Sequence, residues 1–178
     1  MKKGFTMIEL IFVIVILGIL ASVAIPRLAG TREDAEISAA VANLRTLLGD
    51  AASYYVLKGT FTGTKWTEIT SVPLKKNNTG AAMDAATDAI GTAATAYLKV
   101  GDVNDCIGVQ IVEKTDTVPA HIKFTPKAAA TGQSAVAGVC GKVLESKPVA
   151  AYINSVVKPS TGDAIQNAMA IGSTTKIY

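Results

Sequence analysis

The stretch that decides the fold lies at the N-terminus, where residues 5–26 read FTMIELIFVIVILGILASVAIP. From Leu10 to Ile25 none of the residues is charged and all but a glycine and a serine are apolar. A helix over this run covers roughly 24 Å, which is short for a membrane, whereas a start at Phe5 gives the ~20 residues that cross the ~30 Å hydrocarbon core. The longer helix places Glu9 inside the membrane, where an ionisable side chain is costly and indicates a function.

Two ordinary kinds of N-terminal segment fit this composition. A secretory signal peptide would use Lys2 and Lys3 as its charged start and Ser22-Val23-Ala24 as its cleavage site. A plain membrane anchor would keep the two lysines in the cytoplasm. Glu9 argues against the signal peptide, because a carboxylate at the start of the apolar run weakens insertion.

The residues around Glu9 favour a third kind of segment. Residues 2–10 read KKGFTMIEL, which resembles the leader and cleavage site of type IV pilins and of the related type II secretion pseudopilins. The resemblance is specific over residues 2–26 and fades by about residue 55, so it covers roughly a third of the chain. It implies that a prepilin peptidase cuts between Gly4 and Phe5 on the cytoplasmic side, and that Phe5 becomes an N-methylated first residue.

By the same resemblance, Glu9 matches the glutamate that this family uses in subunit assembly. A helix that packs among identical helices buries its N-terminal amine, and Glu9 can neutralise that charge within one subunit or on a neighbour. The alternative is that Glu9 only reaches toward the lipid headgroups. Gly18 and Pro26 match family positions where the helix loosens or bends, and a proline also removes one backbone hydrogen bond.

Beyond Pro26 the pattern changes to that of an amphipathic helix. Apolar residues recur at helical spacing on one face: Ile37, Val41, Leu44, Leu47, Leu48, Ala51, Ala52, Tyr55 and Val56. Gly59 is a suitable stop after Lys58. We therefore expect one long bent helix over residues 5–58.

The predicted fold class is α+β, with this long bent helix packed on a small head that contains an antiparallel sheet. The chain divides into a leader (1–4), a transmembrane or filament-core helix (5–26), the amphipathic half of that helix (27–58) and a globular head (59–178). Within the head we expect a loop over 59–79, a helix over 81–98, strands over 106–114 and 121–127, a further strand over 132–141, a short helix over 148–157 and a last strand or tail over 174–178.

Cys106 and Cys140 are the two cysteines of the chain. An even pair in an exported head favours one disulfide, and the family resemblance points the same way because many pilins carry a disulfide in the C-terminal region. Two buried free thiols are the alternative. A disulfide over this loop would contribute about 3–4 kcal/mol in the chain-entropy model.

Charge and residue counts exclude several classes of function. The 17 Lys and Arg face 14 Asp and Glu, and two of the basic residues are the leader lysines, so no stripe exists that would bind nucleic acid. A single histidine leaves no usual zinc site. Asp102, Asn104 and Asp105 could hold calcium, as in the major pseudopilins that the chain resembles, but their spacing favours a solvated turn. No other cofactor is expected.

These observations predict a structural subunit of a type IV pilus-like filament rather than an enzyme. The resemblance implies three kinds of partner: a prepilin peptidase, identical or related pilin subunits, and an inner-membrane assembly machinery. It also implies a single-pass protein of the bacterial inner membrane, with its N-terminus cytoplasmic, that later joins a periplasmic or extracellular filament. The alternatives are a pseudopilin of a type II secretion system and an exported binding domain behind an ordinary signal peptide.

Overall fold

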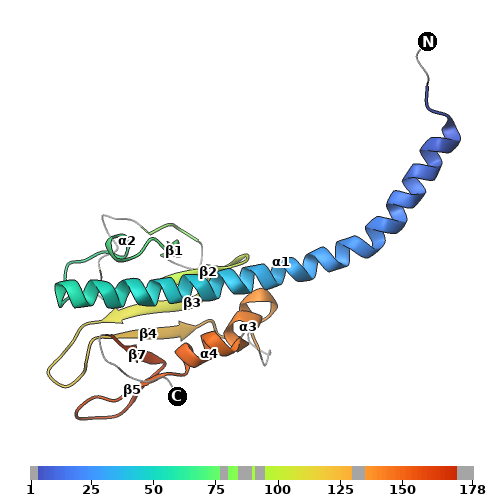
Figure 1. Ribbon diagram of the computed structural model, residues 1–178. Coiled ribbons are helices and arrows are strands. Elements are labelled where there is room, and N and C mark those ends of the chain that lie inside the picture. Colours follow the sequence, from blue (N-terminus) through green and yellow to red (C-terminus); the bar gives the residue numbers. More distant parts are fainter. Residues whose placement is uncertain (1–3, 77–79, 84–89, 91–94, 130–134, 172–178) are drawn as a thin grey trace. The chain divides into compact units, whose positions relative to one another are not determined.

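The computed structural model describes residues 4–76, 80–83, 90, 95–129 and 135–171 (Figure 1). The chain divides into two compact units, Met1–Ala35 and Glu36–Tyr178, and helix α1 (Met7–Lys58) contributes to both. The predicted fold class is confirmed, because a long N-terminal helix is followed by a head with an antiparallel sheet.

Helix α1 is continuous over its 52 residues. The backbone stays helical at Gly18 and at Pro26, so neither residue interrupts α1, and the bend expected at these positions stays a prediction. The helix ends at Lys58, as expected. Gly59 follows it with a positive φ of 73°, and its N–H donates to the Tyr55 carbonyl oxygen at 2.7 Å. A left-handed glycine of this kind ends a helix by satisfying one of its last carbonyl groups.

The second half of α1 buries one face in the head. Its fully buried residues are Ala40, Leu44, Leu47, Leu48 and Ala51. Ile37, Val41, Ala52 and Tyr55 are half-buried and pack against the same core. The predicted apolar face is therefore confirmed except at its last member, Val56, which is 75% exposed.

Five strands form one antiparallel sheet in the order β1-β2-β3-β4-β7. Their bounds are Leu74–Lys75, Ala96–Val100, Val103–Val112, His121–Pro126 and Ala168–Ala170. In the middle of the sheet Val109 lies opposite Ala96 on β2 and opposite Phe124 on β4, and all three side chains are buried. Alternate residues of these strands form the core with α1, whose second half lies along the sheet (Figure 1).

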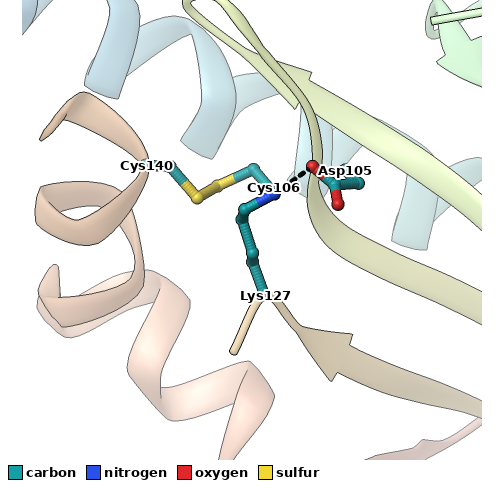
Figure 2. Close-up of polar contacts among 4 residues, drawn as sticks. All are labelled: Asp105, Cys106, Lys127 and Cys140. Atoms are coloured by element: carbon teal, nitrogen blue, oxygen red, sulfur yellow. Dashed lines mark hydrogen bonds and ion pairs between the residues drawn. A yellow bond between two sulfur atoms is a disulfide. The ribbon is translucent and has the colours of Figure 1, made fainter. Parts of the chain in front are cut away.

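Smaller elements complete the head: α2 (Trp66–Ile69), α3 (Gly138–Glu145), α4 (Lys147–Ile153) and a second sheet of β5 (Val156–Val157) and β6 (Ile165–Gln166). A disulfide joins Cys106 on β3 to Cys140 on α3, with 5.7 Å between the Cα atoms (Figure 2). The predicted disulfide is confirmed, and the alternative of two free thiols is wrong. Both cysteines are completely buried, so this bond ties the C-terminal helices to the sheet.

The helix predicted over residues 81–98 is wrong at both ends: Ala82 forms an antiparallel bridge with Lys75, and Ala96, Tyr97 and Leu98 belong to β2. Ala96 and Leu98 are buried and Tyr97 is half-buried, which is the period of two that a strand requires. The alanine-rich composition favoured a helix, but pairing with β3 decides the conformation. Residues 84–89 and 91–94 of that prediction lie outside the described residues.

Three other predictions for the head also need correction. Residues 138–141 begin α3 rather than extend the sheet, and residues 132–134 lie outside the described part. The helix predicted over 148–157 ends at Ile153, and Val156–Val157 form β5. The predicted loop over 59–79 contains α2 and β1, short elements that tertiary contacts stabilise, since Trp66 and Leu74 are buried. The prediction for 174–178 lies outside the described residues.

Candidate processing and assembly site

The first turn of α1 is capped by two side chains that bond to each other's backbone. The Thr6 N–H donates to Oε2 of Glu9 at 3.0 Å, and the Thr6 hydroxyl donates to the same oxygen at 2.7 Å. The Glu9 N–H donates in turn to Oγ1 of Thr6 at 3.4 Å. This reciprocal arrangement is a capping box, which satisfies backbone N–H groups that have no partner inside the helix. It explains why α1 begins at Met7, two residues later than predicted.

This pairing was not among the features expected from the sequence. Thr6-Met7-Ile8-Glu9 has the spacing of a capping box, a threonine followed three residues later by a glutamate and then by an apolar run. That signal was available in the sequence. Glu9 therefore has a local structural role in addition to the assembly role that the family resemblance implies.

Gly4 and Phe5 lie before the helix, outside any regular element, and both are exposed to solvent. Phe5 is 91% exposed. A Cβ atom added to Gly4 would meet no other atom within 4 Å, and φ of Gly4 is not in the region that favours glycine. The fold of this chain therefore does not require a glycine at position 4.

The segment that follows presents an apolar surface on all sides of the helix. Every large apolar residue from Met7 to Leu28 is exposed, including Leu10, Phe12, Leu17 and Leu20. Helix α1 is long and apolar enough to cross a membrane, and no part of its most apolar 18-residue window is buried inside the chain. A helix that is apolar on all sides needs lipid or other protein around it. A Cβ atom added to Gly18 would also meet nothing within 4 Å outside its own helix backbone, so its small size serves nothing within this chain.

The three residues considered for calcium do not form a common set of free ligands. Asp105 accepts a charge-assisted hydrogen bond from Nζ of Lys127 at 2.5 Å (Figure 2). The amide of Asn104 lies against the backbone of Gly80, and Asp102 is exposed in the turn between β2 and β3. Among the described residues no group of three His, Cys, Asp or Glu side chains is placed to hold a metal ion.

Similar proteins share the N-terminal part of these features. Residues 1–25 match the family model of the prokaryotic N-terminal methylation motif. Curated relatives include the type II secretion system core protein G of Klebsiella pneumoniae, 43% identical over 53 residues, which are 30% of this chain and 38% of that protein. The protein of the same name from Aeromonas hydrophila is 48% identical over 46 residues, 26% of this chain and 32% of that protein. No solved structure matches the chain.

The alignments thus span about a third of the length of these relatives. They support the N-terminal assignment, in which a methylation motif leads into a helix suited to anchoring in the inner membrane. The head, with its disulfide and five-stranded sheet, is described by the structure alone. The N-terminal segment of this chain is a prepilin-type methylation motif, and the chain is similar in sequence, over about a quarter to a third of its length, to the type II secretion system core protein G.

Proposed function

We propose that this chain is a structural subunit of a pilus-like helical filament, processed by a prepilin peptidase and assembled from the inner membrane. The observation that carries the proposal is the exposed apolar half of α1, which follows directly on the methylation motif. The role is structural rather than catalytic. The cytoplasmic leader is removed after Gly4, and the head stands on the far side of the membrane.

The peptidase step fits the first residues. Gly4 and Phe5 form an exposed, non-helical substrate, and the fold does not require glycine at position 4. The requirement for glycine then lies in the peptidase, whose active site must accommodate the residue before the cut. Lys2 and Lys3 hold the leader in the cytoplasm by the positive-inside rule.

Assembly replaces lipid around α1 with the α1 helices of neighbouring subunits. This exchange gains little hydrophobic free energy, because lipid tails are as apolar as leucine. Close packing and polar pairs must therefore supply the specificity. An interface between two different surfaces of identical subunits does not close on itself and generates a filament.

Glu9 provides the polar pair. The two bonds from Thr6 use one carboxylate oxygen, Oε2, and a carboxylate has about four lone-pair sites. Glu9 can therefore keep its cap on α1 and still accept a hydrogen bond from the methylated Phe5 amine, in its own subunit or in a neighbour. A buried amine left without this partner would be strongly unfavourable.

The first test is the intact mass and N-terminal sequence of the protein from its native membrane fraction. We expect a chain that begins at Phe5 and carries one added methyl group. A chain that begins at Ile25 would lack Glu9 and would contradict the proposal in favour of an exported domain with an ordinary signal peptide.

The second test separates processing from assembly. Glu9→Ala is expected to be cut after Gly4 as the wild type is, yet to yield no filaments in the fraction sheared from cells. Glu68→Ala, which removes an exposed glutamate of the head, is the matched control and should assemble normally. Normal filaments from Glu9→Ala would show that Glu9 has no role in assembly.

A second candidate is a subunit of a type II secretion pseudopilus, favoured by the similarity to core protein G. The two functions predict different phenotypes for a strain in which the gene is deleted. Loss of a pseudopilin leaves secreted enzymes in the periplasm, whereas loss of a pilin removes surface fibres and leaves secretion intact. Comparing the extracellular proteins and the surface fibres of a deletion strain with those of its parent decides between them.

A further inference from the structure

A pocket of about 340 Å³ on the head is lined by residues of α2, of β1 and of the segments that follow them. Trp66, Pro73 and Met83 supply apolar surface, and the exposed Thr67 and Ser71 add hydroxyl groups. The volume is at the lower end of the ~300–1,000 Å³ typical of small-molecule sites. A mainly apolar wall with a few polar groups is also typical of such sites.

The charge at this pocket is positive. Lys75 is the one charged side chain among the described lining residues, and none of these residues is acidic. An ammonium group offers three hydrogen-bond donors and no acceptor, and the hydroxyl groups of Thr67 and Ser71 can donate as well. A bound group that is negatively charged and accepts hydrogen bonds therefore matches the lining better than a cation or a pure hydrocarbon does.

The indole N–H of Trp66 is a further donor, and the protein leaves it unpaired. Trp66 is 1% exposed, and among the described residues its Nε1 is the one buried side-chain nitrogen or oxygen without a hydrogen-bond partner. An indole N–H donates and cannot accept. A buried donor without a partner is unfavourable, so its presence in a folded protein needs an explanation. Because Trp66 also lines the pocket, an acceptor bound there would give this N–H its partner.

Hydrogen bonds fix the chain segments that line the pocket. The Thr70 hydroxyl donates to Oδ2 of Asp50 on α1 at 2.6 Å and accepts the Val72 N–H at 3.2 Å. Farther along the chain, Lys75 and Ala82 form an antiparallel bridge, which ties two lining segments to each other. A pocket with fixed walls loses little conformational entropy when a ligand binds.

We propose that this pocket binds a small organic carboxylate with an apolar tail. In the complex the carboxylate accepts hydrogen bonds from the Trp66 indole N–H and from the Lys75 ammonium group, and the tail packs against Pro73 and Met83. A hydrogen bond to an ionised acceptor is stronger than one between neutral groups. The inference does not depend on the proposed function, because it concerns the head of a single copy.

Titration of the full chain in detergent micelles tests the site directly, since Trp66 is the single tryptophan of the chain. Its emission and its indole N–H resonance in the NMR spectrum therefore report on this pocket alone. Sodium hexanoate is the probe, and hexan-1-ol, which has the same carbon chain without the charge, is its control. Hexanoate should change the emission saturably and move the indole proton resonance downfield. Hexan-1-ol should bind at least about fivefold more weakly. Because the alcohol enters micelles more readily, an effect on the detergent alone would be larger with the alcohol.

Matched variants test the residues of the site. Lys75→Met removes the ammonium group and should weaken hexanoate binding about five- to tenfold. Lys65→Met removes the same charge from the residue before α2, which is not among the described lining residues, and should leave the affinity unchanged. Ala82→Leu fills part of the pocket and should abolish binding, whereas Ala81→Leu, at the exposed neighbouring position, should retain it. An unchanged emission maximum without hexanoate checks that the surroundings of Trp66 are intact in each variant.

Any one of three results would overturn the proposal: no saturable change of emission with hexanoate, equal affinities for hexanoate and hexan-1-ol, or equal losses in Lys75→Met and Lys65→Met. Saturable binding that leaves the indole resonance in place would overturn it as well, because Trp66 would then donate no bond to the ligand. None of these results bears on the filament function, which the mature N-terminus and the Glu9→Ala variant test separately.

Discussion

Thr6 and Glu9 cap the first turn of α1 together, with Oγ1 of Thr6 2.7 Å from Oε2 of Glu9. The residue that the family resemblance assigns to assembly is therefore also the residue that fixes where α1 begins. Replacing Glu9 by alanine removes both the cap and the charge, so the loss of filaments alone does not say which of them matters. A substitution that keeps one and removes the other is needed.

Glu9→Gln makes that separation. Glutamine also closes a capping box, because its side-chain oxygen accepts the Thr6 N–H, but it carries no charge to pair with the Phe5 amine. We expect the start of α1 to remain intact and filament assembly to fail. Hydrogen exchange of the first-turn amides in detergent micelles measures the cap, and the sheared fraction measures assembly.

Thr6→Val is the complementary variant, since it removes the hydroxyl and keeps Glu9. Losing an N-cap side chain costs about 0.5–2 kcal/mol, so first-turn amides should exchange roughly 2- to 30-fold faster. Filaments from Glu9→Gln in normal amounts would mean that the cap, and not the charge, is what assembly needs.

The Cys106–Cys140 disulfide is expected to account for much of the stability of the head. It closes a loop of sequence separation 34, and the chain-entropy model assigns such a loop about 3–4 kcal/mol. Cys106→Ala with Cys140→Ala should lower the free energy of unfolding by about this amount, as measured by urea titration of the full chain in detergent.

Reduction gives an independent control for that experiment. Because the chain has two cysteines and both are in this bond, a thiol reductant acts on no other site. The wild type in reductant should unfold at a urea midpoint close to that of the double alanine variant. A double variant as stable as the oxidised wild type would show that the bond contributes nothing.

The elements that the sequence predicts well are those with a long, regular pattern. The apolar run from Leu10 to Ile25 and the spacing from Ile37 to Tyr55 predict α1 because each pattern covers several helical turns. Strand β4 is predicted within one residue, since apolar and polar residues alternate from His121 to Lys127. Local sequence is sufficient where one face of a long element meets the core.

Prediction fails where tertiary pairing decides the conformation of a short or ambiguous segment. Ala96 and Leu98 belong to an alanine-rich stretch whose composition favours a helix, but β3 pairs with them as a strand. At the candidate site the sequence identifies Gly4, Phe5 and Glu9 through the motif. It does not reveal the exposure of Val56, because a helical pattern cannot say where the head stops covering the helix.

The ion pair between Asp105 and Lys127 is expected to contribute little to stability. The Asp105 and Lys127 side chains are 23% and 36% exposed. An ion pair with this exposure typically contributes about 0–1 kcal/mol to the free energy of unfolding. A double-mutant cycle with Asp105→Asn and Lys127→Met should give a coupling free energy within that range, decreasing as salt is added.

The same variants test whether calcium binds to residues 102–105. Because Asp105 is paired with Lys127, millimolar calcium should leave the melting temperature of the wild type unchanged. A calcium-dependent rise in the wild type that disappears in Asp105→Asn would contradict this and would point to a calcium site at Asp102–Asp105.

Glu113 is expected to be the residue that fixes the loop after α1. Its Oε1 accepts the Phe61 N–H at 2.5 Å and the Thr60 and Thr62 hydroxyls at 3.3 Å. Phe61 is completely buried, so Glu113→Ala leaves its N–H without an acceptor. A buried donor without a partner costs about 1–3 kcal/mol, and urea titration should show a loss of this size.

Glu113→Gln separates the hydrogen bond from the charge, because the amide oxygen still accepts from Phe61. It should lose less stability than Glu113→Ala. Equal losses in the two variants would mean that the charge of Glu113, and not its hydrogen bond to the Phe61 N–H, fixes the loop.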